Sequence, residues 1–116
     1  MVLPKRGEVY YVAFDPTLGV EIKKTRPALI IQNDIGNLHS QATIVAAITS
    51  TVREAFPYEV ATAGGEGGLP KDSLVLLNQV RTIDKKRLRK KLGMLSSETM
   101  KNVDRAIAVS LGLTKI

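Results

Sequence analysis

The sequence predicts a mainly β fold, a small antiparallel barrel with one α-helix at its C-terminal end. Short segments rich in β-branched and aromatic residues follow one another up to residue 84, and turn residues separate them. Only the last segment has the period of a helix. The 116 residues suit one domain, 1–116, and a hydrophobic content of 44% predicts a packed core.

The first predicted strand is EVYYVAF, residues 8–14, and it ends at Asp15-Pro16 because proline cannot donate to a strand ladder. Residues 15–26, DPTLGVEIKKTR, follow as a polar loop with a cationic end. The second strand is PALIIQ, residues 27–32, with its proline at the tolerated first position. Residues 33–37, NDIGN, have the composition of a turn.

The third strand is ATIVAAIT, residues 42–49, which is apolar and therefore predicted to be buried on both faces. Residues 57–62 form a weaker strand, expected at a sheet edge. The glycine-rich segment 63–70 lacks the Lys-Ser or Lys-Thr pair of a phosphate-binding loop and ends in proline, so it predicts a mobile hairpin tip. Residues 73–83 predict two strands, or one strand with a bulge near Asn78.

The C-terminal segment predicts an amphipathic helix. Ser96 or Ser97 can cap it, because a serine hydroxyl accepts a hydrogen bond from an amide of the first turn. Its predicted apolar face comprises Met100, Val103, Ile107 and Leu111, and its predicted solvent face Lys101, Asp104 and Arg105.

The charge balance favours an anionic partner. Lys and Arg number 17 against 11 Asp and Glu, which gives a net charge of +6. Nucleic acid is the first candidate partner and an acidic protein or a lipid surface the next, although solubility alone also explains a basic chain. With no cysteine, disulfides, thiolate metal sites and a cysteine nucleophile are excluded. The N-terminus lacks the apolar region of a signal peptide and the apolar run 44–48 is too short to span a bilayer, which predicts a cytoplasmic protein with no membrane partner.

Two further features leave alternatives open. His39 is the only histidine, which rules out a two-histidine ribonuclease mechanism and favours a solvated loop residue over a catalyst. The run 85–91 holds six cations in seven positions, which fits either a solvated basic face or a track for a phosphate backbone, with a slight preference for RNA. Asp84 can cap a short helical turn at the start of this run.

One constellation suggests a site. Pro27 fixes the backbone directly after Arg26 and so holds the guanidinium at a junction of loop and strand. If the second and third strands pair antiparallel, the start of one lies beside the end of the other. Arg26 and Thr49 are then expected on the same rim of the sheet.

Five segments of the chain resemble, in their order and spacing, the MazF/PemK toxins of bacterial toxin–antitoxin pairs, and most closely the Gram-positive MazF proteins. They are KRGEVY (5–10), RPALIIQND (26–34), IVAAIT (44–49), DSLVLL (72–77) and QVRTIDKKRL (79–88). The resemblance implies an SH3-like barrel of the MazF/PemK/CcdB kind, a homodimer, and a sequence-specific endoribonuclease (an mRNA interferase) that cleaves single-stranded RNA without a metal or other cofactor. It also implies neutralisation by a MazE-type antitoxin with an acidic C-terminal segment.

The resemblance assigns site residues as well. The key arginine of the family falls on Arg26 and its key threonine on Thr49, as the catalytic pair. The loop GVEIKKTR (19–26) departs from the family pattern at several positions, so the cleavage sequence is not predicted. The expected RNA-binding residues are Glu21, Lys24, Thr25, Ser50 and Gln79.

These residues permit attack of the ribose 2′-hydroxyl on the adjacent phosphate, which gives a 2′,3′-cyclic phosphate and a 5′-hydroxyl. Arg26 can stabilise the phosphorane, Thr49 can hold a phosphate oxygen or orient the nucleophile, and Glu21 is a candidate base. The rival hypothesis is a non-enzymatic toxin that resembles the CcdB gyrase poisons, but this chain has no tryptophan near its C-terminus or elsewhere. A third hypothesis is a barrel that binds RNA without cleaving it.

Overall fold

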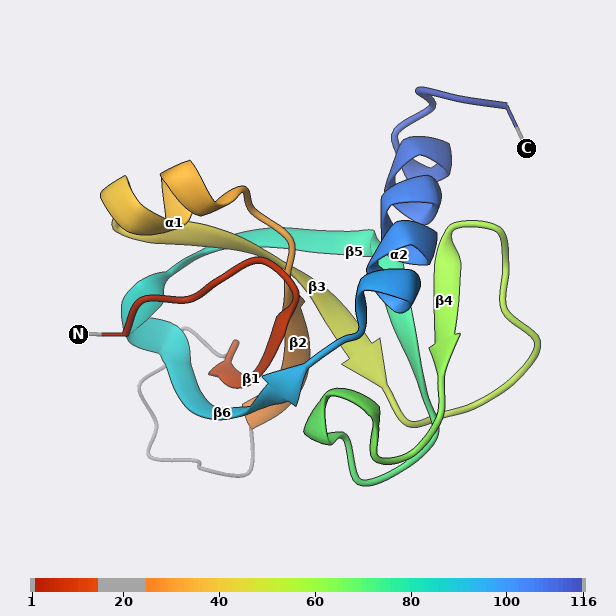
Figure 1. The fold of residues 1–116 in the computed structure, drawn as a ribbon, viewed down its shortest axis with the longest axis horizontal. Coiled ribbons are helices and arrows are strands. Elements are labelled where there is room, and N and C mark those ends of the chain that lie inside the picture. The colour runs from red at the N-terminus through yellow and green to blue at the C-terminus, as the bar shows by residue number, and fades with distance from the viewer. Residues whose placement is uncertain (1, 15–24, 116) are drawn as a thin grey trace.

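The computed structural model describes residues 2–14 and 25–115, whose strands form one antiparallel sheet in the order β4-β5-β3-β2-β1-β6 (Figure 1). Its strands are β1 (Glu8–Ala13), β2 (Thr25–Ile30), β3 (Ala42–Thr49), β4 (Glu59–Thr62), β5 (Ser73–Asp84) and β6 (Leu88–Met94). Its helices are α1 (Asp34–His39) and α2 (Ser97–Ser110), with short 3-10 turns η2 (Glu66–Gly68) and η3 (Lys85–Arg87). The mainly β architecture with a C-terminal helix is confirmed.

The sheet curls into a barrel, but its two edge strands, β4 and β6, do not pair with each other by hydrogen bonds. Instead η2 packs against β6 across the gap. The backbones meet so closely that a Cβ on Gly68 would lie 2.0 Å from the carbonyl oxygen of Leu92. The glycine-rich segment 63–70 is therefore a packed closure of the barrel, and the prediction of a mobile hairpin tip is wrong.

Apolar side chains fill both faces of the middle strands. On one face, Val9, Leu29 and Ala46 pack beneath α2, which lies over the β4–β5 side of the sheet (Figure 1). On the other face, Val12 and Val45 belong to a second cluster that the curled sheet encloses without a helix. β3 has the predicted bounds, and its neighbouring Val45 and Ala46 point into different clusters, as burial on both faces requires.

β4 and β5 agree with the sequence. β4 is an edge strand, as predicted. β5 is continuous, and Leu76 pairs with Ala47 while Val80 pairs with Ala46, so the residues between them form a bulge that includes Asn78. One strand with a bulge is thus the correct alternative.

β2 begins earlier than predicted, at Thr25 rather than Pro27, and it ends at Ile30. Pro27 lies inside the strand opposite Tyr11 of β1, whereas pairing with β3 starts only at Ala28. The amide of Ile31 donates to Ile44 of β3 at 2.9 Å, so by alternation the amide positions of residues 29 and 27 also face β3. Because Pro27 has no N–H, the next donor to β3 is missing and the two strands separate at this point.

Residues 34–39 form α1, not the turn that was predicted for 33–37. The side chain of Asn33 caps the helix by accepting a hydrogen bond from the amide of Gly36 at 2.8 Å. The buried side chain of Asn37 accepts hydrogen bonds from Gln32 at 3.0 Å and from Thr43 at 2.7 Å. These contacts join α1 to β3, and such tertiary bonds stabilise a helix that is too short to form alone.

The basic run contains a strand that the sequence did not predict, β6, which pairs with β1. At least four cations of the run have structural partners, since Arg87 and Arg89 each donate to a backbone carbonyl. Lys91 lies 2.5 Å from the buried carboxylate of Glu8, and the buried ammonium of Lys85 donates to the backbone carbonyl of Asn37. The run is therefore neither a uniformly solvated face nor a uniform track for a phosphate backbone. The predicted cap by Asp84 is confirmed, because its carboxylate accepts a hydrogen bond from the amide of residue 86 at 2.8 Å.

α2 agrees with its prediction except at its end. Ser96 is the N-cap, and its hydroxyl accepts a hydrogen bond from the amide of Thr99 at 3.1 Å. Val103 and Ala106 are buried against the sheet. Leu111 was predicted on the apolar face, but it is 65% exposed because it follows the last helical turn as the C-cap.

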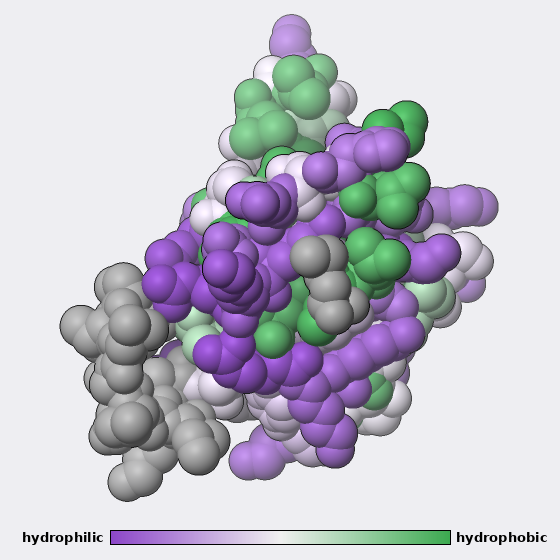
Figure 2. All heavy atoms as spheres, turned by 90° about the vertical axis from the view of Figure 1, so that its left-hand side faces the viewer, coloured by the Kyte–Doolittle hydropathy of each residue, from purple (hydrophilic) through white to green (hydrophobic). Residues whose placement is uncertain are grey.

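The face that carries the N-terminus and α1 is mainly hydrophilic, with separate apolar areas (Figure 2). Ile35 and Leu38 of α1 are among the exposed apolar side chains. Within the part of the chain that the structure describes, no helix has both the length and the apolar character needed to cross a membrane.

The closure of the barrel by η2 gives a stability prediction. Gly68→Ala should lower the free energy of unfolding by at least about 2 kcal/mol, because it adds a Cβ at φ +78° against a backbone carbonyl. Gly65→Ala is the matched control, since Gly65 also has a positive φ but a Cβ there would meet no atom within 4 Å. Urea denaturation measures both variants. Equal losses would mean that η2 does not press on β6.

Candidate functional site

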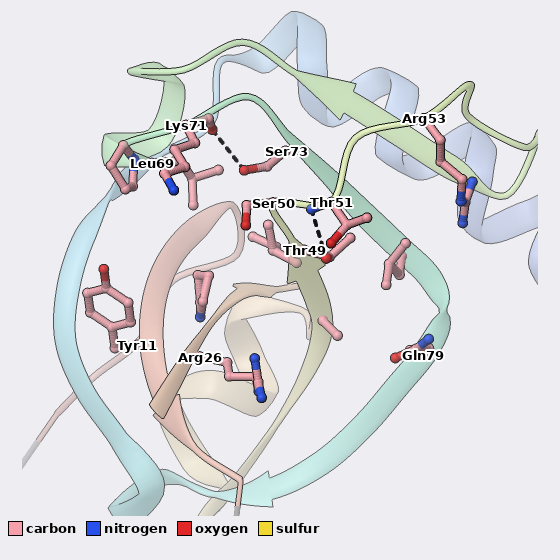
Figure 3. A pocket seen from close by; sticks show the side chains of 15 residues that line it. Tyr11, Arg26, Thr49, Ser50, Thr51, Arg53, Leu69, Lys71, Ser73 and Gln79 are labelled. Carbon is pink, nitrogen blue, oxygen red and sulfur yellow. Dashed lines mark hydrogen bonds between the residues drawn. The ribbon is translucent and has the colours of Figure 1, made fainter. Parts of the chain in front are cut away.

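A groove of about 660 Å³ opens where β2 and β3 separate (Figure 3). Pro27 has removed the hydrogen bond that would hold the strands together there, so the start of β2 and the end of β3 form its floor. The start of β5 and the loop after β3 complete it. The lining residues are Tyr11, Arg26, Pro27, Ala47, Ile48, Thr49, Ser50, Thr51, Arg53, Leu69, Pro70, Lys71, Ser73, Leu76 and Gln79.

Arg26 and Thr49 both line this groove, as the antiparallel pairing of β2 with β3 predicts. The Arg26 side chain is exposed and projects from the start of β2 (Figure 3). Thr49 is half-buried, and its hydroxyl oxygen accepts a hydrogen bond from the amide of Thr51 at 3.1 Å. This bond orients the hydroxyl and leaves its proton available to an acceptor in the groove.

The structure brings together some of the other predicted residues. Ser50 and Gln79 also line the groove, and both are exposed. Thr25 lies at the start of β2 but is not among the lining residues. Glu21 and Lys24 fall outside the described residues.

The sequence did not predict five polar lining residues, Tyr11, Thr51, Arg53, Lys71 and Ser73. A signal for Lys71 was present. It lies two residues before β5, which pairs antiparallel with β3, so the rule that joined Arg26 to Thr49 also puts the start of β5 beside the end of β3. No comparable signal exists for Arg53, which lies in the loop between β3 and β4.

The described lining contains three cationic side chains and no Asp, Glu or His. The charge of Arg53 is compensated, because its two terminal nitrogens lie 2.7 and 2.8 Å from the carboxylate oxygens of Glu59. Its guanidinium also lies 4.9 Å from the ring centre of Phe56. For Arg26 and Lys71, no ion pair with another described residue is present.

The perturbed acids lie outside the groove. Hydrogen bonds from Arg53, opposed in part by burial, hold the pKa of Glu59 below its ordinary value, and a bond from the Phe56 amide lowers it further. A hydrogen bond from the Arg6 amide, with a second from Asn37, lowers the pKa of Asp34. Burial, with the nearby carboxylate of Glu8, raises the pKa of Tyr10 to about 12.

His39 is exposed in the last turn of α1, just before β3 begins and so at the opposite end of β3 from Thr49. It is solvated, as predicted, although it lies in a helix rather than a turn. The described groove therefore offers guanidinium, ammonium, hydroxyl and amide groups. These groups bind phosphate oxygens well, whereas metal ions in proteins are held mostly by carboxylate, imidazole or thiolate groups.

Comparisons with known proteins agree on one family. Residues 5–111 match the model described as PemK-like, MazF-like toxin of type II toxin-antitoxin system. The chain is 45% identical over 113 residues to Endoribonuclease EndoA of Bacillus subtilis (strain 168), covering 97% of each chain. It is also similar to a solved endoribonuclease from Mycobacterial species in complex with its cognate antitoxin, with a TM-score of 0.79 and 29% identity. The match covers 97% of this chain and 99% of that one. A second endoribonuclease structure from Mycobacterial species matches with TM-score 0.81, 27% identity and coverage of 100% and 98%.

The ion pair beside the groove predicts how stability depends on pH. The pKa of Glu59 is lowered by folding, so its stabilisation is present above the ordinary value of 4.5 and is lost as the pH falls through the lowered value. The urea midpoint of the native protein should therefore fall from about pH 7 to about pH 3, and Glu59→Gln should show a smaller fall. Glu54→Gln is the control, because Glu54 is an exposed neighbour whose carboxylate makes no ion pair with a described residue. Identical pH profiles for the two variants would refute the role of the Arg53–Glu59 pair.

Proposed function

Since the chain belongs to the PemK-like, MazF-like toxin family of type II toxin–antitoxin systems, we propose that it is an endoribonuclease toxin that cleaves single-stranded RNA in the groove between Arg26 and Thr49. The family favours this enzyme over the gyrase poison of the CcdB kind. The observation that carries the proposal is the meeting of these two side chains in a groove whose described lining is cationic and has no acidic residue. Such a groove attracts a polyanion and orients its phosphates.

The reaction begins with the RNA's own nucleophile. The 2′-oxygen forms a bond to the adjacent phosphorus, the bond from phosphorus to the 5′-oxygen breaks, the 2′-hydroxyl loses its proton and the leaving oxygen gains one. Arg26 stabilises the extra negative charge of the phosphorane, because the N–H groups of its planar guanidinium can bind two phosphate oxygens at once. The proton of the Thr49 hydroxyl points to a phosphate oxygen, since the amide of Thr51 already occupies a lone pair of that hydroxyl.

Other groups position the RNA. Ser50 and Gln79 contact it within the groove, and Thr25 contacts it at the start of β2. Lys24, outside the described residues, is a further proposed contact. Glu21 is the proposed base. A guanidinium holds its protons strongly, so the role of Arg26 is electrostatic rather than that of a general acid.

The reaction needs no metal ion or other cofactor. A guanidinium supplies the positive charge that a metal would bring to the phosphorane. The described lining offers none of the carboxylate, imidazole or thiolate groups that hold metals in proteins, and no group of three such residues occurs elsewhere in the part of the chain that is described.

The partners follow from the same charge. A MazE-type antitoxin inhibits the enzyme by inserting an acidic C-terminal segment where RNA binds, in keeping with the similar endoribonuclease that was solved in complex with its cognate antitoxin. The protein acts in the cytoplasm, where it meets mRNA. Two copies form a homodimer that covers exposed apolar side chains such as Leu111 and Leu113.

The central test is substitution of the two residues. Arg26→Ala should lower the cleavage rate by about 10²-fold or more, because a charge-stabilising donor is lost from the transition state. Thr49→Ala should lose less, and Thr49→Ser should keep more activity than Thr49→Ala if the hydroxyl is what matters. Cleavage of a fluorescent single-stranded RNA gives the rates, and mass spectrometry should find 2′,3′-cyclic phosphate ends.

Arg105→Ala is the matched control, since Arg105 is an exposed arginine on α2 that does not line this groove. It should cleave at nearly the native rate. A folded Arg26→Ala variant with full activity would overturn the assignment.

The absence of a metal requirement is tested with a chelator. Cleavage of an unstructured RNA should continue at an unchanged rate in excess EDTA, because the charge on the phosphorane is stabilised by Arg26. An unstructured substrate separates this effect from the dependence of RNA folding on magnesium. Loss of activity in EDTA that magnesium or manganese restores would contradict the mechanism.

A further inference from the structure

We propose that Lys71 forms a second phosphate-binding subsite of the groove, on the β5 side, which holds a backbone phosphate of the RNA away from the one that is cleaved. This inference rests on the proposed function, in which the groove takes single-stranded RNA. The subsite positions the strand and contributes affinity, whereas Arg26 acts on the phosphate that reacts.

The sheet order separates the two cations. β3 lies between β2 and β5, so the end of β3 has Arg26 on one side and the start of β5 on the other. Figure 3 shows Lys71 and Arg26 at opposite sides of the opening with Thr49 between them. Two strand spacings amount to about 10 Å, so an RNA strand that crosses the end of β3 brings different phosphates to the two sides.

Contacts of the neighbouring residues fix the backbone at Lys71. Leu69 is 1% exposed and anchors the segment in the core, and Pro70 restricts the backbone directly before the lysine. The hydroxyl of Ser73 donates to the carbonyl of Lys71 at 2.8 Å (Figure 3). The carboxylate of the next residue, Asp72, accepts from the amide of Gly64 at 2.7 Å. A backbone fixed in this way loses little further conformational entropy when the lysine side chain binds a ligand.

The charge of Lys71 is uncompensated among the described residues. Asp72 is its nearest acidic neighbour in sequence, but that carboxylate is bonded to a backbone amide of the loop. Arg53, the remaining cation of the groove, is different, because Glu59 occupies both of its terminal nitrogens. Of the three cations in the described lining, Lys71 and Arg26 are thus available to an anion.

Lysine suits a positioning contact. Its ammonium is a compact charge on a flexible stem, which can follow a phosphate without reading a base. The hydroxyl of Ser50, which is exposed on the same groove, can donate to another oxygen of that phosphate. The subsite therefore adds affinity that does not depend on sequence but does depend on salt.

The test measures binding separately from cleavage. The probe is a single-stranded RNA with one 2′-deoxynucleotide at the cleavage position, which lacks the nucleophile, and fluorescence anisotropy gives Kd at several salt concentrations. Lys71→Gln should weaken binding by about 5- to 10-fold at moderate salt. It should also make the plot of log K against log salt less steep, by about 0.7 in slope. With cleavable RNA, the loss should fall on KM rather than on kcat. Lys71→Arg keeps the charge and should recover most of the affinity.

Lys90→Gln is the matched control. It removes the same charge from an exposed lysine on β6 that does not line the groove, and it should change Kd by less than about 2-fold.

Equal effects of Lys71→Gln and Lys90→Gln would mean that only net charge matters and would overturn the subsite. An unchanged salt dependence of Kd in Lys71→Gln would also overturn the subsite. A fall in kcat with KM unchanged would overturn it too, because Lys71 would then act on the reacting phosphate. If the wild-type protein cleaves RNA and Lys71→Gln matches it, only this inference fails, whereas a wild-type protein that neither binds nor cleaves RNA refutes the proposed function itself.

Discussion

Pro27 lies inside a central strand, where a residue without an amide hydrogen leaves a gap in the ladder. β2 pairs with β1 from Thr25 onward, but it pairs with β3 only from Ala28. The gap therefore opens toward β3 alone, and Arg26 stands at its edge. The same proline restricts the backbone beside Arg26, so one residue both makes the groove and fixes its main cation.

The rest of the fold keeps that gap in a constant shape. The curled sheet places the start of β2, the end of β3 and the start of β5 around one opening, and two apolar clusters hold the strands from both faces. Gly68 lets η2 close the barrel without a hydrogen-bonded edge, and Leu69 carries the chain from there into the groove wall. The stability of the barrel closure and the geometry of the groove thus depend on the same short segment. Rigid supports of this kind allow a few side chains to orient a flexible RNA strand.

The sequence predicted the features that local patterns determine. β3 and α2 were predicted closely because an apolar run and a capped amphipathic period need no distant partner, and the meeting of Arg26 with Thr49 followed from strand order alone. α1 was missed because its stability comes from the tertiary bonds of Asn37. β6 was missed because an edge strand can carry charged residues on its exposed side, which obscures the alternation of polar and apolar positions. Arg53 lies in a loop, where the path of the chain depends on contacts that no periodic pattern encodes. Lys71 was missed although the antiparallel pairing of β3 with β5 puts the start of β5 beside the end of β3.

The most direct measurement of the central claim is a crystal structure of the protein with an RNA whose cleavage site carries a 2′-deoxynucleotide. The phosphate at this nucleotide is expected to lie within hydrogen-bond distance of both the Arg26 guanidinium and Thr49, in the gap that Pro27 opens. An RNA strand that instead follows the exposed cations of β6, with Arg26 and Thr49 free of any phosphate, would contradict this claim.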